Sequence, residues 1–189
     1  MKVRELFSGK VYTVSNLLTL VRVIAVPVIV YYMHLEKTTG NREYMYYQVF
    51  YFGIIIVSDF FDGFLARTFN QVSRLGQFLD PVADKICLVV IGSSLVYYKG
   101  FPLCVLVVVL LRELVVVVGA VFLFARRDVE VQPSMLGKMG VACMALSALL
   151  YIASFDHILF NIVSVKFLTV SLILIFYVPG SVLYVKNYS

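Results

Sequence analysis

Charged residues are scarce in this sequence, and tryptophan is absent. Of the 189 residues, 14% are charged and 61% are hydrophobic, and the mean hydropathy is +0.94. Soluble domains are about one quarter charged and roughly half apolar. The shortage of charge therefore argues against a soluble protein. It predicts an integral membrane protein with a single domain, residues 1–189.

Cysteines are also few. The sequence has three, Cys87, Cys104 and Cys143, and all of them lie inside apolar runs. Their number is odd and their spacing is not that of metal ligands, which argues against a cysteine metal site. We expect them to be small buried hydrophobic residues.

Apolar stretches, by contrast, are long and numerous. A helix needs about 20 mostly apolar residues to cross a bilayer. Six stretches qualify, and they are separated by breaks that carry Gly, Pro, Asn or charge. The runs are continuous and lack the alternation of a β-barrel, so the expected fold class is all-α. The predicted transmembrane helices are residues 14–33, 45–66, 76–98, 101–125, 137–155 and 159–184.

Basic residues are distributed unevenly between the two sides of this predicted bundle. An even number of spans puts both termini on one side, where nine of the 16 Lys and Arg residues lie, against four on the other side. The positive-inside rule then places both termini, and the loop between the second and third spans, on the cytosolic side of the membrane. We expect this membrane to be a bacterial-type inner membrane or a plasma membrane. The net charge of +5 fits an anionic lipid surface, and we expect no nucleic-acid partner.

Four aspartates stand out at the cytosolic ends of the second and third predicted spans. Asp59 and Asp62 are three residues apart, and Asp80 and Asp84 are four apart, so each pair shares one helix face. Four uncompensated carboxylates at membrane depth would cost on the order of 10 kcal/mol. Two divalent cations balance these charges, and carboxylate oxygens suit Mg²⁺ or Mn²⁺. A cation pathway in a transporter would use the same side chains.

The residues around the aspartates favour an enzyme over a transporter. Gly63, Ala66 and Gly76 are small and let a bulky ligand approach the backbone, which ion conduction does not require. Arg67 carries a guanidinium suited to phosphate oxygens. Carboxylate-held metals, an arginine and a glycine-lined pocket are typical of phosphoryl transfer.

The spacing of these residues resembles that of a known family. The run Asp59-x2-Asp62-Gly63-x2-Ala66-Arg67-x8-Gly76-x3-Asp80-x3-Asp84 is similar to the signature of the CDP-alcohol phosphotransferases (CDP-alcohol phosphatidyltransferases). The resemblance implies transfer of a phosphatidyl group from CDP-diacylglycerol to an alcohol, with release of CMP. It also implies that homodimers are possible.

The same resemblance implies residue roles. The four aspartates would hold two Mg²⁺ or Mn²⁺ ions, and Asp84 would take the proton from the acceptor hydroxyl. Residues implied to contact the CDP-lipid within and beside the signature are Gly63, Ala66, Arg67, Ser73 and Gly76.

A second run of polar residues lies on the first predicted span. Asn16, Thr19 and Arg22 are spaced three apart and resemble the family's N-x-x-T-x-x-R pattern. This resemblance implies that Asn16 and Thr19 contact the CDP-lipid and that Arg22 lies at the acceptor pocket. The alternative is that Asn16 and Thr19 cap the helix. Lys85 is either a counter-ion of the aspartates or an interface residue.

The acceptor depends on residues elsewhere in the chain. Arg112 and Glu113 are two charged residues within the fourth predicted span. They form either a buried salt bridge with each other, or a site in which Arg112 binds an anionic acceptor together with Lys138. The run GQFLDPVADK at residues 76–85, followed by RE at 112–113 and LGK at 136–138, resembles the family branch whose acceptor is glycerol 3-phosphate and whose product is phosphatidylglycerophosphate. The sequence departs from that branch at Ala120, where an arginine is usual, and at Gly140, where the run GKxKT reads GKMGV. The cardiolipin synthase group, which uses phosphatidylglycerol, is the alternative.

Overall fold

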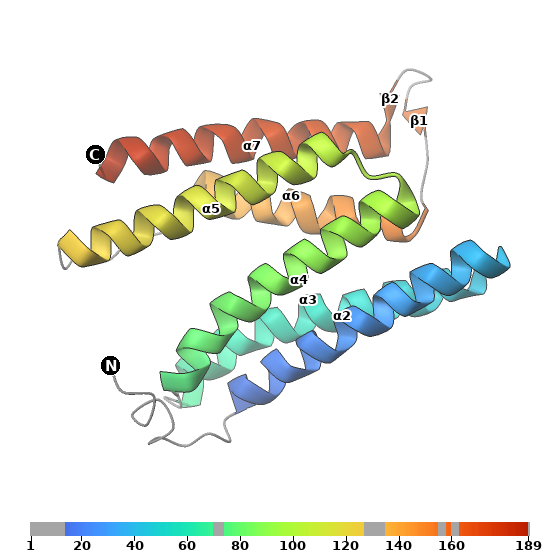
Figure 1. Ribbon diagram of the computed structural model, residues 1–189, viewed down its shortest axis with the longest axis horizontal. Helices are drawn as coiled ribbons and strands as arrows, with labels where there is room; N and C mark the ends of the chain where they lie inside the picture. Colours follow the sequence, from blue (N-terminus) through green and yellow to red (C-terminus); the bar gives the residue numbers. More distant parts are fainter. Residues whose placement is uncertain (1–13, 70–73, 127–134, 155–157, 160–162, 189) are drawn as a thin grey trace. The chain divides into compact units, whose positions relative to one another are not determined.

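The chain is described by a computed structural model, which places residues 14–69, 74–126, 135–154, 158–159 and 163–188. Figure 1 shows helices throughout this part of the chain, with one small hairpin of two strands. The elements are α2 (Val14–Thr39), α3 (Glu43–Phe69), α4 (Arg74–Lys99), α5 (Leu103–Arg126), α6 (Met135–Ile152), β1 (Ile158–Leu159), β2 (Val163–Ser164) and α7 (Val165–Tyr188). In the described residues, the predicted all-α class and its six helices are therefore confirmed.

The first helix is longer than predicted, because α2 continues six residues beyond position 33 to Thr39. The Thr38 and Thr39 hydroxyls donate hydrogen bonds to main-chain carbonyls of the preceding turn, so these polar residues extend the helix. Gly40 ends it with a φ of 69°, a conformation that favours glycine. The side chain of Asn41 then accepts a hydrogen bond from the Glu43 amide at 2.9 Å and starts α3.

The start of the last helix was predicted wrongly. A helix was expected from residue 159, but Ile158–Leu159 pairs with Val163–Ser164 as an antiparallel hairpin, and α7 begins at Val165. Each strand has two residues, too few to show the alternation that marks a strand in a sequence.

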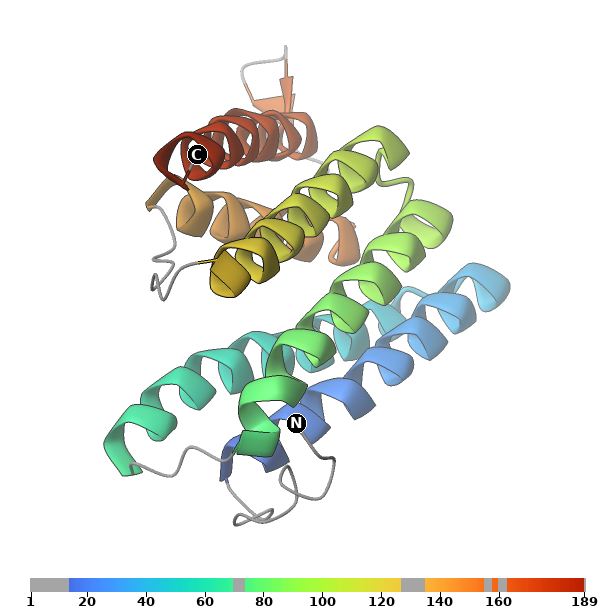
Figure 2. The same ribbon diagram turned by 60° about the vertical axis from the view of Figure 1, so that its left-hand side comes forward.

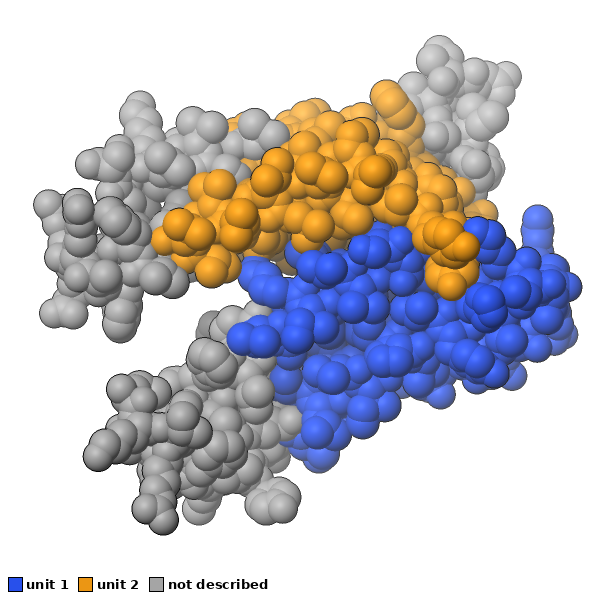
Figure 3. All heavy atoms as spheres, in the orientation of Figure 1, with its two compact units in different colours: residues 1–94 blue, residues 95–189 orange. Residues whose placement is uncertain are grey.

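The chain divides into two compact units, residues 1–94 and 95–189, which are coloured separately in Figure 3. In the first unit, α2 and α3 lie side by side as an antiparallel hairpin (Figures 1 and 2). Buried residues recur along α2 every three or four positions, as a helix packed on one side requires. They are Thr19, Arg22, Ala25, Val26, Ile29 and Met33.

In the second unit, α7 packs against both α5 and α6. Its buried positions Thr169, Val170, Ile173 and Tyr177 form one stripe. Thr169 shares a hydrogen bond of 3.1 Å with Ser147 of α6, and both hydroxyls are buried. A paired hydroxyl contact of this kind joins helices without leaving a polar group unsatisfied.

The outward faces of the helices are strongly apolar. Large hydrophobic side chains are exposed along α2, α5 and α7, including Leu20, Ile24, Leu111, Leu114 and Ile175. Such continuous apolar surface is unusual for a protein in water. By length and composition, the described residues contain one helix able to cross a membrane on its own, Leu17–Thr39, together with shorter apolar segments at Gly137–Ile152 and Lys166–Tyr177.

The expectation that all the cysteines are buried is correct for Cys87 and wrong for Cys104, which is exposed, while Cys143 is intermediate. Cys104 lies near the start of α5 on its outward face, beside exposed Leu103. An apolar run that faces outward gives the same sequence signal as a buried one, which is why the prediction failed.

Candidate functional site

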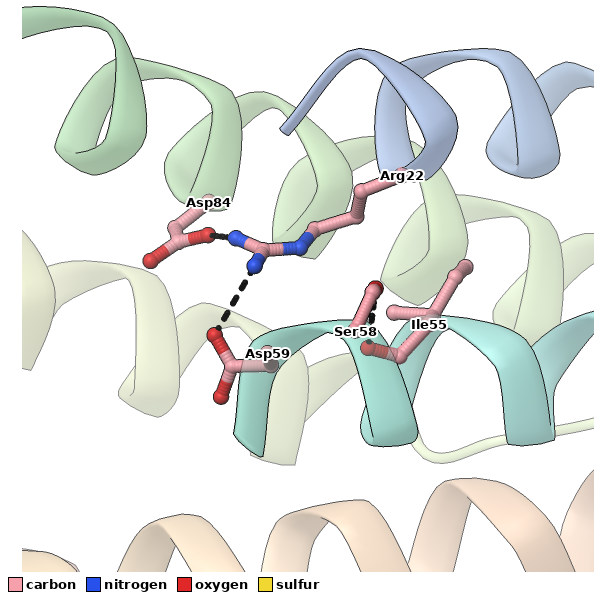
Figure 4. Close-up of polar contacts among 5 residues, drawn as sticks. All are labelled: Arg22, Ile55, Ser58, Asp59 and Asp84. Atoms are coloured by element: carbon pink, nitrogen blue, oxygen red, sulfur yellow. Dashed lines mark hydrogen bonds and ion pairs between the residues drawn. The ribbon is translucent and has the colours of Figure 1, made fainter. Parts of the chain in front are cut away.

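Arg22 is at the centre of a charged cluster that joins three helices. Its side chain extends from α2 and is 4% exposed. One terminal nitrogen lies 3.1 Å from Oδ1 of Asp59 on α3, and the other forms an ion pair and hydrogen bond with Oδ1 of Asp84 on α4. Figure 4 shows the guanidinium between the two carboxylates. The cluster brings together residues that are 62 positions apart in the sequence.

The packing of each helix explains how these side chains meet. Arg22 continues the buried stripe of α2, one turn after the buried Thr19. On α3, Ser58 is buried and donates a hydrogen bond of 2.9 Å to the carbonyl of Ile55 within its own helix (Figure 4). The neighbouring Asp59 is exposed, and its carboxylate reaches the arginine.

Asp84 is held in a similar way on α4. The flanking residues Ala83 and Cys87 are buried, and with Ile91 they form one face of the helix at a spacing of four. Asp84 lies beside this face, where its carboxylate contacts Arg22.

Burial is unequal within the cluster. The cation is almost fully covered, whereas the side chains of Asp59 and Asp84 are 67% and 48% exposed. In Figure 4 the second oxygen of each aspartate points away from the guanidinium. A buried cation is costly unless it is paired, so the two carboxylates stabilise Arg22, and Arg22 in turn keeps the carboxylates close together.

The donor set fits a hard divalent cation. Asp59 and Asp84 present carboxylate oxygens from adjacent helices and are both directed at one positive group. Oxygen ligands of this kind suit Mg²⁺ or Mn²⁺ better than zinc. Across the described ranges, no group of three or more metal-binding side chains is found. The predicted four-carboxylate site therefore stays a prediction.

Several predicted site residues lie outside the part of the chain whose side chains are described. Their backbones belong to α2, α3 or α4, except for Ser73, which lies between helices outside the described ranges. These residues are Asn16, Asp62, Gly63, Ala66, Arg67, Ser73, Gly76 and Asp80.

The contact between Arg22 and the aspartates was not predicted. The sequence suggested Lys85 as one possible counter-ion and placed Arg22 at an acceptor pocket. In the structure Arg22 contacts both Asp59 and Asp84, and the acceptor role of Arg22 stays a prediction. The signal that could have revealed the contact is the burial of Arg22 in the apolar stripe of α2, because a buried arginine requires carboxylate partners.

A second charged group lies in the second unit. Arg112 forms an ion pair with Glu113 through Nη1, and the two side chains are 17% and 11% exposed. The salt bridge considered from the sequence is therefore present. The Arg112 guanidinium also lies over the ring of Tyr177, with its central carbon 4.8 Å from the ring centroid. Lys138, the other predicted acceptor contact, is exposed on α6.

Similar proteins agree on one family. A family model described as CDP-alcohol phosphatidyltransferase matches residues 12–178. A CDP-diacylglycerol–glycerol-3-phosphate 3-phosphatidyltransferase of Aquifex aeolicus (strain VF5) is 33% identical over 170 residues, which are 86% of this chain and 89% of the relative.

Two other relatives carry the same name. Proteins from Wigglesworthia glossinidia brevipalpis and Escherichia coli (strain K12) are each 38% identical over 108 residues. These alignments cover 54% and 56% of this chain and 56% and 57% of the relatives. Because the family model matches residues 12–178 of the 189 in this chain, the chain belongs to the CDP-alcohol phosphatidyltransferase family.

Proposed function

We propose that this protein transfers the phosphatidyl group of CDP-diacylglycerol to glycerol 3-phosphate, giving phosphatidylglycerophosphate and CMP. The observation that carries the proposal is the convergence of Asp59 and Asp84 on Arg22, since both aspartates belong to the run that resembles the family signature and lie within the residues matched by the family model. The acceptor is supported by the names of the relatives, each of which is a glycerol-3-phosphate 3-phosphatidyltransferase.

The proposed reaction is a single displacement at phosphorus. The acceptor hydroxyl attacks the phosphorus that carries the diacylglycerol, the bond from that phosphorus to the CMP oxygen breaks, and CMP leaves. The hydroxyl proton passes to a carboxylate oxygen of Asp84, which acts as general base. Arg22 limits the movement of Asp84 through its contact with Oδ1, so the base is positioned before the acceptor binds.

Asp59, Asp62, Asp80 and Asp84 would hold two Mg²⁺ or Mn²⁺ ions, and the bound ions would neutralise the diphosphate and the departing CMP. Arg67, with Gly63, Ala66, Ser73 and Gly76, would contact the CDP group, as would Asn16 and Thr19. Arg112 and Lys138 would bind the phosphate of the acceptor through charge-assisted hydrogen bonds.

We also propose a multi-pass arrangement, with six membrane-spanning helices, both termini in the cytosol and the aspartates at the cytosolic surface. The exposed apolar side chains of the helices and the excess of basic residues on the side of the termini support it. In this arrangement a water-soluble acceptor reaches the reacting phosphate from the cytosol, while the lipid tails stay in the bilayer.

The experiment that tests this function is a panel of acceptors. Purified full-length protein in detergent is mixed with labelled CDP-diacylglycerol and Mg²⁺ or Mn²⁺, and then with glycerol 3-phosphate, phosphatidylglycerol, serine or inositol phosphate. We expect CMP release and labelled phosphatidylglycerophosphate with glycerol 3-phosphate. A cardiolipin product with phosphatidylglycerol alone would contradict the proposed acceptor. Metal flux into proteoliposomes, with no CMP release from any acceptor, would contradict the proposed reaction.

A further inference from the structure

The ring of Tyr177 lies against two residues of different helices within the second unit. Tyr177 is on α7 and is 2% exposed. The centroid of its ring lies 4.8 Å from the guanidinium carbon of Arg112 on α5. The ring also contacts Gly140 on α6. This single aromatic side chain therefore bridges the two other helices of the unit.

Gly140 makes the position of the ring possible. A Cβ atom added at Gly140 would lie 2.4 Å from Cδ2 and 2.8 Å from Cε2 of Tyr177, closer than real Cβ atoms approach other atoms. The hydroxyl of Tyr177 lies 3.8 Å from the sulfur of Met144, one turn further along α6. The ring thus lies along α6 over a gap that only glycine leaves. Gly140 also lies where the sequence departs from the GKxKT run of the glycerol 3-phosphate branch.

Arg112 is held but retains donors for a ligand. A guanidinium carries five N–H donors, and the ion pair with Glu113 uses Nη1. Within the described residues, the buried Nε of Arg112 has no hydrogen-bond partner. A flat cation stacked on an aromatic ring keeps its plane fixed, so an anion that enters the site meets the remaining donors in one orientation.

We propose that Tyr177 is a positioning residue for the acceptor site: its ring holds the Arg112 guanidinium in the orientation that binds a small phosphate monoester, and Gly140 is required because it leaves room for the ring. The proposal rests on the proposed function, which supplies glycerol 3-phosphate as the phosphate monoester. It adds two residues, Tyr177 and Gly140, to those that determine acceptor binding.

The test compares two substitutions of the same residue. Tyr177→Phe keeps the ring and removes the contact with Met144, whereas Tyr177→Leu keeps an apolar side chain and removes the ring. We expect Tyr177→Leu to raise the KM for glycerol 3-phosphate about three- to tenfold, the range that corresponds to losing one cation–π contact. We expect Tyr177→Phe to match the wild type, and the KM for CDP-diacylglycerol to stay unchanged in both variants.

A second pair of variants tests the role of glycine. Gly140→Ala should raise the same KM, because the added methyl group must displace the ring from the position in which it holds Arg112. In the double variant Gly140→Ala/Tyr177→Leu the methyl group no longer meets a ring, so the two effects should be less than additive. If Tyr177→Leu does not fold, as judged by thermal unfolding in detergent, Gly140→Ala alone gives the same test.

The possible results separate the two proposals. No turnover of the wild-type protein with glycerol 3-phosphate contradicts the proposed function. If the wild type turns over glycerol 3-phosphate but Tyr177→Phe and Tyr177→Leu have equal KM values, the role of Tyr177 is contradicted and the proposed function is not. An unchanged KM in Gly140→Ala leads to the same conclusion. Equal increases in the KM for both substrates, together with a lower Tm, would show a packing role and would also overturn the inference.

Discussion

At the scale of single residues, the main feature of the first unit is a buried cation between two exposed anions. Arg22 uses two separate nitrogens of one planar guanidinium for two carboxylates on different helices, whereas a lysine would offer all its donors from a single nitrogen. The charges of Arg22, Asp59 and Asp84 together leave the cluster one negative charge in excess. An excess of negative charge of this kind is consistent with the proposed binding of a divalent cation.

Replacing Arg22 with lysine should separate these two carboxylates. The shorter side chain carries one ammonium group and is not able to contact Asp59 and Asp84 in the same geometry. We expect Arg22→Lys to lower kcat on the order of 10–100-fold, because a small displacement of catalytic groups has effects of this size. Arg42→Lys, at an exposed arginine between α2 and α3, is the matched control and should keep wild-type turnover. Wild-type turnover in Arg22→Lys would show that the cluster does not position Asp84.

Replacing Asp84 with asparagine keeps the shape of the side chain and removes its basicity. If Asp84 is the general base, kcat should fall about 10²–10⁴-fold. Binding of labelled CDP-diacylglycerol to the purified variant should remain measurable. The control is Glu43→Gln, an exposed carboxylate at the other end of α3, where the rate should not change. An unaltered rate in Asp84→Asn would remove it from the role of base.

At the scale of helices, the hairpin of α2 and α3 is held at its other end by aromatic and polar contacts. The ring of Tyr32 stacks on Tyr44, Tyr47 and Tyr51 of α3, with centroid distances of 6.0, 4.9 and 6.0 Å. Gln48, which is fully buried, donates a hydrogen bond of 2.6 Å to Glu36. Arg22 at one end and the tyrosines at the other fix the register of the two helices.

Removing the central ring should loosen this hairpin. Tyr32→Ala should lower the free energy of unfolding by about 1–3 kcal/mol, because it removes a half-buried ring and its stacking contacts. Tyr46→Ala is a matched control on α3, since Tyr46 is 69% exposed, and it should change stability by less than about 0.5 kcal/mol. Thermal unfolding in detergent measures both. Equal Tm values for the two variants would contradict the role of the stack.

Helices of this protein are readily predicted from the sequence, whereas contacts between them are not. Long apolar runs and breaking residues located the six helices of the described residues, because those signals are local. The C-terminal end of α2 was predicted too early. The hydroxyls of Thr38 and Thr39 donate hydrogen bonds to carbonyls of the preceding turn of α2, which the composition of the segment does not reveal.

Candidate site residues show the same division. The spacing of Asp59 and Asp84 within the run of aspartates predicted both as site residues. The salt bridge between Arg112 and Glu113 could also be anticipated, because the two residues are adjacent in the sequence. The contact of Arg22 with the aspartates and that of Tyr177 with Gly140 join residues far apart in the chain. Such pairs depend on how helices pack, and a single sequence carries no periodic signal for them.

At the scale of the whole molecule, the proposed reaction depends on divalent cations while the fold has its own internal counter-ion. Chelation with EDTA should abolish CMP release, and Mg²⁺ or Mn²⁺ should restore it. Helix content measured by circular dichroism should not change on chelation, because Arg22 still pairs with Asp59 and Asp84. Full activity in the presence of EDTA would contradict the metal requirement.

The proposed orientation predicts which loop is accessible from outside the cell. Residues 40–42 join α2 to α3 and would lie on the outer side, opposite to both termini. In a variant without Cys87, Cys104 and Cys143, we expect Arg42→Cys to react with a membrane-impermeant maleimide in intact cells. A cysteine at Lys186, near the C-terminus, should react only after the cells are opened. The reverse pattern would place the termini outside.

The burial of Arg22 also has a consequence for biogenesis. A chain is made from its N-terminus, so in the proposed arrangement α2 would meet the membrane with Arg22 before α3 and α4 have emerged to pair Asp59 and Asp84 with it. An arginine within an apolar helix costs about 2.5–3.5 kcal/mol on insertion scales. Insertion of α2 should therefore be incomplete in a nascent chain that stops after α2, and it should become complete once α3 and α4 have supplied their carboxylates. The cluster that positions the proposed catalytic base would thus also commit the first helix to the bilayer.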